Sequence, residues 1–214
     1  MSSSQVIAIE AVVDDGERPA LVATAEQLDE CLAAASESRR DIRLAFAPSL
    51  TAIDASATVI IASLLPEVAR DEPLSSTEER WRRELAVLPA IPIFLCTIFR
   101  HVPRNGSGPS DPSATIERIR RLNLLAVDLS HDCGAAIIDI DRAFAHLGAR
   151  VLGTDYRLPG AVAAEIAAHT IAGSLLEVGL DDVIAREVAQ RAMKFQGAPW
   201  QIGDLLTRRK AQRR

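Results

Sequence analysis

Two loops of this sequence gather cationic and aromatic side chains that could bind an anion. They are Arg100, His101 and Arg104 in the motif RHVPR, and Tyr156 and Arg157 in the motif GTDYRLPG. Guanidinium groups present paired N–H donors that fit a carboxylate, phosphate or sulfate group. These five residues predict a small-anion site. The competing interpretation is a solvated surface loop in which the arginines pair with nearby Asp or Glu side chains.

Other acidic and imidazole groups favour structural roles. Asp139 and Asp141 in IIDIDRAF could ligate a metal, but residues at this spacing also cap a loop or pair with Arg142. His169 lies in an Ala-rich helical stretch beyond Asp155, where an offset of ten residues is roughly 15 Å of rise. It is therefore too far from the Asp155 loop to act as its base. We predict neither a metal site nor a cofactor.

Composition limits the compartment and the partners. The chain has 214 residues, is 48% apolar and carries a net charge of −5, so it can bury a core and has no general affinity for nucleic acid. Cys31, Cys96 and Cys133 form no CxxC pair, which argues against a disulfide framework or a zinc site. The start of the chain lacks a signal-peptide pattern, and no apolar run reaches the roughly 18 residues that span a bilayer. We expect a cytoplasmic protein without a membrane or nucleic-acid partner.

The elements that must position these residues alternate along the chain. Short apolar runs predict strands at 6–13, 42–47, 58–65, 91–99 and 135–140. Amphipathic runs predict helices that begin near Thr24, Ser76, Ser113 and Gly160. Gln27 follows Thr24, and Glu79 follows Ser76, at the spacing of capping boxes. Apolar strands separated by helices indicate a parallel sheet covered on both faces, which is a doubly wound α/β sandwich.

Ligands of such sheets bind beyond the carboxyl ends of the strands, so the loops after Val13, Ala47, Leu65, Phe99 and Ile140 are the informative ones. The character of the chain changes at Gly179, where a helix to about Phe195 is followed by a break and the basic end TRRKAQRR. We therefore predict a domain of residues 1–178 and a helical extension with a basic tail at 179–214. Trp200 in this extension could dock onto a partner.

Residues 118–176 resemble the C-terminal half of an SGNH/GDSL hydrolase. The matching features, in order, are a helix with an Asn, the strand AAIIDI, the segment AFAHLG, the loop DYRLP and a final helix. Upstream, 57–67 and 89–99 resemble the third and fourth strands of that family. The resemblance implies a flavodoxin-like three-layer α/β/α sandwich with a parallel five-stranded sheet, here followed by a C-terminal helical extension. It also implies ester hydrolysis or acyl transfer by a serine, oxyanion donors and a D-x-x-H pair.

The blocks that carry this chemistry in the family are altered here. The loop VVDDGERPA after the first strand has no serine, and ASLLPEVARDE after the third has neither the Gly nor the Asn of an oxyanion hole. In DYRLP, Asp155 and Pro159 match the family, but Leu158 stands where the histidine base would be. A serine hydroxyl without a base is a poor nucleophile at neutral pH.

One serine could replace the missing nucleophile. The segment FAPSLTA imitates a GDSLT block and follows a predicted strand, which makes Ser49 the best substitute. It comes one strand and one helix too late, however, and only about eight residues separate it from the next strand. A Pro-Ser turn is the simpler interpretation of this segment.

Three functions are compatible with the sequence. The first is a non-catalytic binding or accessory subunit that meets a protein partner or a second copy of itself through the C-terminal extension. The second is an esterase or acyltransferase that uses Ser49, or another chemistry at the Arg100, His101 and Arg104 edge. The third is a regulatory module that binds a small anion and shares only the fold with hydrolases.

Overall fold

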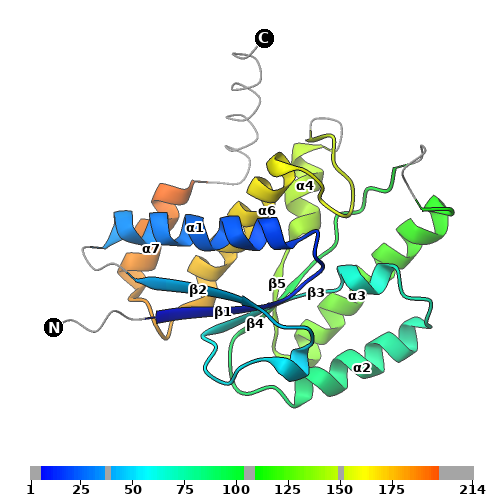
Figure 1. Ribbon diagram of the computed structural model, residues 1–214, viewed down its shortest axis with the longest axis horizontal. Coiled ribbons are helices and arrows are strands. Elements are labelled where there is room, and N and C mark those ends of the chain that lie inside the picture. The colour runs from blue at the N-terminus through cyan, green and yellow to red at the C-terminus, as the bar shows by residue number, and fades with distance from the viewer. Residues whose placement is uncertain (1–5, 37–39, 104–108, 149–151, 198–214) are drawn as a thin grey trace, which may run out of the picture.

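The computed structural model describes residues 6–36, 40–103, 109–148 and 152–197, and their arrangement is drawn in Figure 1. Arg104, Trp200 and the basic tail lie outside the described residues, so the predictions that concern them are not addressed by the structure. The described residues form one sheet with helices on both of its faces (Figure 1).

The sheet has five strands, and all of them are parallel. They are β1 (Val6–Val12), β2 (Asp41–Phe46), β3 (Val59–Ser63), β4 (Ile93–Cys96) and β5 (Ala136–Ile138). Their order is β2-β1-β3-β4-β5, so the direction of winding reverses between β1 and β3. This is the flavodoxin-like order, and it confirms the predicted three-layer sandwich. The reversal point is where ligands of such sheets bind.

The helices divide between the two faces. The described α-helices are α1 (Arg18–Ala35), α2 (Leu74–Ala86), α3 (Pro112–Cys133), α4 (Ile140–Leu147), α6 (Ala161–Ser174) and α7 (Arg186–Gln196). Short 3-10 turns lie at Leu50–Ala52 (η1) and Leu65–Val68 (η2), and a π-helix (η3) at Leu175–Gly179. Helices α2 and α3 cover one face of the sheet, and α1, α4, α6 and α7 lie on the other (Figure 1).

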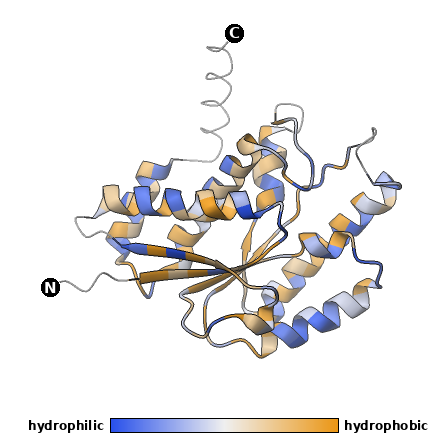
Figure 2. Cartoon of the chain, in the orientation of Figure 1, coloured by the Kyte–Doolittle hydropathy of each residue, from blue (hydrophilic) through white to orange (hydrophobic). Residues whose placement is uncertain are grey.

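Each face of the sheet has its own hydrophobic core, because successive side chains of a strand point to opposite faces. Ile9 and Ile61 pack in the cluster beneath α1 and α6, while Ile60 and Leu95 pack in the cluster beneath α2 and α3. The inner strands β3 and β4 are correspondingly apolar, the edge strand β2 carries hydrophilic residues, and α2 is largely hydrophilic on its outer side (Figure 2). Burial on both faces explains why the sequences of β3 and β4 are continuous apolar runs, whereas β2 at the edge begins with alternating polar and apolar residues.

Two helices begin earlier than the capping boxes predicted. Helix α1 starts at Arg18 rather than at Thr24, which is buried and donates from Oγ1 to the carbonyl oxygen of Ala20 in the preceding turn. Helix α2 starts at Leu74 after Pro73, so Ser76 lies inside its first turn. Both capping-box predictions were wrong. In each case a proline stands at the helix start, Pro19 in the first turn of α1 and Pro73 at the N-cap of α2, which is where a helix tolerates a residue without a backbone N–H.

The chain leaves the sheet at Cys96, although the apolar run continues to Phe99. The side chain of Asn123 on α3 accepts from the backbone N–H of Ile98 at 2.7 Å and donates to its carbonyl oxygen at 2.8 Å. Both backbone groups of Ile98 are thus bonded to a helix side chain instead of a neighbouring strand. This contact turns the Arg100–His101 loop away at the carboxyl edge of the sheet.

The described part of the C-terminal extension shares the core of the main domain. Leu180, Ile184, Ala189 and Ala192 are buried in the same cluster as β1 and α1. Contrary to the expectation from the sequence, the stretch Ala161–Gly179 is long and apolar enough to cross a membrane by length and composition, but half of it is buried inside the fold. It therefore has the character of a core helix.

Candidate functional site

The two loops predicted to bind an anion meet at the carboxyl edge of the sheet. The backbone N–H of Tyr156 donates to the carbonyl oxygen of His101 at 2.8 Å, which joins the loop after β4 to the loop before α6. Arg100 and His101 line a cavity of about 580 Å³ together with Val102 and the start of α3. The sequence analysis grouped His101 with Tyr156, and in the structure the backbones of these two residues are in contact.

Both described arginines of this edge are bound by carboxylates. Arg100 donates from Nε to Asp141 at 2.6 Å, and its backbone N–H donates to the same carboxylate at 2.8 Å. Arg157 donates to Asp155 from Nη2 at 2.5 Å and from Nε at 3.1 Å. Partial burial raises the pKa of Asp155, but the hydrogen bonds from Arg157 outweigh it, so this pKa lies below its ordinary value. An anion at this edge would have to compete with both carboxylates.

The acidic pair Asp139 and Asp141 has structural roles in the fold. Asp139 caps α4 by accepting from the backbone N–H of Arg142 at 3.0 Å, and it also accepts from the hydroxyl of Thr97 at 3.2 Å. Asp141 is buried and holds Arg100. Within the described ranges, no group of three or more metal-ligating side chains lies close enough together to hold an ion.

Leu158 takes an unusual backbone conformation at the position that the resemblance assigns to a histidine. Its φ angle is 53°, in the left-handed region that residues with a Cβ rarely adopt. Its side chain is buried in the core cluster on the α1 and α6 face. At this position the loop directs an apolar side chain into the core.

The loop after β1 lies against the 155–158 loop. At Gly16, an added Cβ would lie 3.6 Å from the carbonyl oxygen of Arg157 and 3.2 Å from the carboxylate of Asp14. The fold thus brings the loop after the first strand next to the DYRLP loop, which is where the family resemblance expects nucleophile and base to meet. The first of these loops offers Asp14 and Asp15 here instead of a serine.

A buried pair that the sequence analysis missed occupies the point where the sheet reverses. Ser63, the last residue of β3, donates from Oγ to Oε1 of Glu17 at 2.7 Å. The backbone N–H of Asp14 donates to Oε2 of the same carboxyl at 2.9 Å, and that of Leu65 donates to the Ser63 hydroxyl at 3.1 Å. Ser63 ends β3 and Glu17 follows β1. Both therefore lie at the reversal point, where ligands of such sheets bind, and this rule could have identified them from the sequence.

Burial changes the acidity of this pair. It raises the pKa of Glu17 to about 7, because the loss of hydration outweighs the hydrogen bonds from Ser63 and from the Asp14 amide. A carboxyl with this pKa can take up or release a proton near neutral pH. The neighbouring thiol of Cys96 is buried and its pKa is raised, chiefly by burial and further by Glu17, so it is not a reactive thiolate.

A crevice of about 450 Å³ opens beside the Glu17–Ser63 pair. Ser49 and Ser63 both line it, together with Asp14 from the loop after β1 and Arg18 at the start of α1. Ser49 is half-buried and its hydroxyl lies 2.9 Å from that of Thr51. Because only a short 3-10 turn separates β2 from β3, Ser49 lacks the helix that follows a nucleophile in the family, as the sequence predicted.

The far wall of this crevice is organised by a buried carboxylate. Glu67 in η2 accepts from Trp81 Nε1 at 3.1 Å and from Arg80 Nη2 at 2.6 Å, and it pairs with Arg70 at 3.3 Å. Trp81 is buried in the core, where its ring packs in the cluster beneath α2 and α3. The wall is therefore a rigid polar network rather than a free set of charges.

His169 lies within the helical layer, and its contacts are not part of the carboxyl edge of the sheet. Its Nδ1 is 2.7 Å from Gln27 Nε2 on α1, and its Nε2 is 2.9 Å from the carbonyl oxygen of Gly197 after α7. The ring is buried and is satisfied when Nε2 carries the proton. The His169 ring thus links three helices. These partners agree with the prediction that His169 does not act as the base of the Asp155 loop.

The burial of His169 makes the stability of the fold depend on pH. Burial lowers the pKa of His169 below 6.5, although the bond to Gly197 partly offsets it. The folded state thus binds fewer protons than the unfolded state, so this contribution to stability is complete above pH 6.5 and is lost as pH falls toward the lowered pKa. We expect chemical denaturation to show a larger loss of stability between pH 7.5 and 5.5 in the wild type than in His169→Gln. Equal losses would contradict the prediction.

No protein-family model matches this chain, and no curated protein sequence matches it. The geometry of the carboxyl edge is therefore the ground for a functional proposal.

Proposed function

We propose that this chain is a binding or accessory protein of SGNH-hydrolase-like fold that does not perform the ester hydrolysis of that family. The observation that carries the proposal is Leu158, which is buried at the position of the base. Asp155, which would orient that base, is instead bonded to Arg157. Without an imidazole at this position, a serine of the neighbouring loops has no proton acceptor of the usual kind.

The proposal includes two binding surfaces and a compartment. Residues 179–214 would contact a protein partner or a second copy of the chain, and a small anion would bind in the cavity beside Arg100 and His101. A cytoplasmic location is consistent with the cysteines of the described residues, which form no disulfide with one another. We expect light scattering of the purified chain, or capture from a lysate compared with a chain that ends at Gly197, to reveal an assembly that depends on the C-terminal residues.

A second candidate is an acyl-transfer enzyme with a displaced nucleophile. The observation in its favour is the hydrogen bond from Ser63 to Glu17, because a carboxyl with a pKa of about 7 is a suitable general base at neutral pH. In this scheme Ser63 takes the role that the sequence analysis gave to Ser49. Its side chain is buried at the end of β3, so a substrate would have to reach it through the crevice.

Ester hydrolysis separates the two candidates. We expect the wild-type chain to hydrolyse short-chain nitrophenyl esters no faster than Ser49→Ala, Ser63→Ala and Glu17→Gln, and to resist labelling by a fluorophosphonate. Hydrolysis that is lost in Ser63→Ala and Glu17→Gln but kept in Ser49→Ala would replace the proposal with the second candidate. Hydrolysis that is lost only in Ser49→Ala would make Ser49 the nucleophile and would also overturn the proposal.

A further inference from the structure

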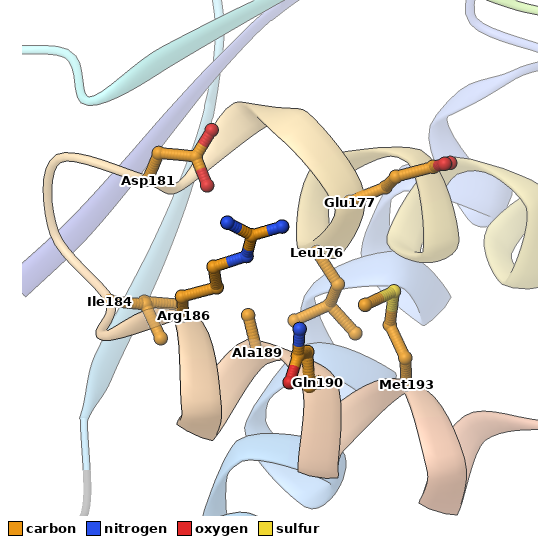
Figure 3. A pocket seen from close by; sticks show the side chains of 8 residues that line it. All are labelled: Leu176, Glu177, Asp181, Ile184, Arg186, Ala189, Gln190 and Met193. Atoms are coloured by element: carbon orange, nitrogen blue, oxygen red, sulfur yellow. The ribbon is translucent and has the colours of Figure 1, made fainter.

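A cavity of about 500 Å³ lies between the π-helix η3, the loop that follows it and α7 (Figure 3). It is on the opposite edge of the sheet from the site described above, since Arg40, just before β2, donates to the carbonyl oxygen of Val183 in this loop at 2.9 Å. Leu176, Ala189 and Met193 line its apolar part. Its volume is in the range of small-molecule sites, which is about 300–1,000 Å³.

A cation and an anion stand side by side at the rim of this cavity. The guanidinium of Arg186, the first residue of α7, lies between Asp181 and Leu176, while the carboxylate of Glu177 points away from it (Figure 3). In the described part of the chain, neither Arg186 nor Asp181 forms a side-chain hydrogen bond or an ion pair. Gln190 adds an amide on the same helix one turn further along. The rim therefore holds polar groups that are available to a ligand.

The π-helix fixes the shape of this cavity. A π-turn inserts an additional residue into a helix and is frequent at functional sites. Here the turn ends at Gly179, where an added Cβ would lie 2.8 Å from the ring of Phe94. The backbone at the end of η3 is thus pressed against the sheet, and the chain turns through Leu180 and Ile184, both buried, before α7 begins. Buried residues thus anchor the loop that carries Asp181 and leads to Arg186.

We propose that this cavity binds a small aliphatic α-amino acid in its zwitterionic form. The ligand carboxylate would pair with Arg186 and its ammonium group with Asp181, while its aliphatic side chain would lie along Leu176 and Met193. A carboxylate without an ammonium group would be repelled by Asp181, and an amine without a carboxylate by Arg186. Adjacent charges of opposite sign therefore select a ligand that carries both.

Direct binding of L-leucine tests this proposal, with 4-methylpentanoate and isopentylamine as probes that lack one of its two charges. We expect L-leucine to bind the full chain with a dissociation constant on the order of 1 mM or below in an NMR titration. Each single-charge probe should bind at least about tenfold more weakly, because tenfold corresponds to about 1.4 kcal/mol, a modest value for one lost charge pair.

A matched pair of variants locates the binding. Asp181→Asn should weaken L-leucine binding about tenfold or more, whereas Asp182→Asn, the same change at the adjacent exposed residue outside the cavity, should leave it unchanged. The proposal is overturned if the wild type does not bind L-leucine at about 20 mM. It is equally overturned if isopentylamine binds as tightly as L-leucine, or if both variants weaken binding alike. None of these outcomes depends on ester hydrolysis at the carboxyl edge.

Discussion

Glu17→Gln should raise the free energy of unfolding at pH 8 by about 2–4 kcal/mol and change it little at pH 4, because the pKa of this carboxyl rises from 4.5 to about 7 on folding. The folded state holds the proton more tightly than the unfolded state. Glu17 therefore contributes most to the stability of the wild type below pH 4.5. This contribution is lost as the pH rises to about 7. Above that pH the carboxyl is charged and buried, and the cost of its burial is constant.

Urea denaturation of both proteins between pH 4 and pH 8 measures this effect, since a neutral amide cannot titrate. The matched control is Glu26→Gln, which removes an exposed carboxyl from the same helix and should shift stability by no more than about 0.5 kcal/mol at either pH. If the difference between Glu17→Gln and the wild type were the same at pH 4 and pH 8, the pKa of Glu17 would not change on folding and would stay near its ordinary value of 4.5. Its role as a neutral-pH acid or base would then be excluded.

Glu67→Ala should destabilise the fold by about 3–5 kcal/mol, which is the usual cost of removing one partner from a buried ion pair. The side chain of Glu67 is 3% exposed, and its loss leaves the indole N–H of Trp81 buried without an acceptor. Arg80 retains its second carboxylate, Glu72, at 2.7 Å, so the loss should not extend to the whole network. In a chain of this size the melting temperature should fall by on the order of 10 °C.

Glu79→Ala is the control for this measurement, because Glu79 is an exposed carboxylate on the adjoining helix α2. Its loss should cost no more than about 0.5 kcal/mol. If Glu67→Ala and Glu79→Ala melted at the same temperature, the crevice wall would not depend on the buried carboxylate.

The fold could be predicted because its signals are local and repeated. Each of the five strands is a short apolar run, and each run is separated from the next by a helix or by a turn rich in Pro and Ser. Burial on both faces of the sheet imposes that pattern on the inner strands β3 and β4, so an error at one boundary does not change the architecture. The boundaries themselves were less certain, as Thr24 and Ser76 illustrate, because several neighbouring residues can begin a helix.

The site could be predicted only to the level of its loops. The parallel sheet places the loops after β1, β3 and β4 at one edge, so the sequence correctly associated His101 with the Tyr156 loop. It could not decide that Arg100 pairs with Asp141, 41 residues away, rather than remaining open to an anion. Both outcomes are consistent with the charges of the sequence, and only the positions of the side chains distinguish them.

The sequence by itself determined the layers, the strand runs and the absence of a histidine at position 158. The tertiary structure decided which polar groups are buried together. Glu17 and Ser63 are 46 residues apart, and each alone is an ordinary residue of a loop or a strand end. Their meeting and the raised pKa of Glu17 follow from packing, because desolvation depends on every element that closes over a group and on no single stretch of chain.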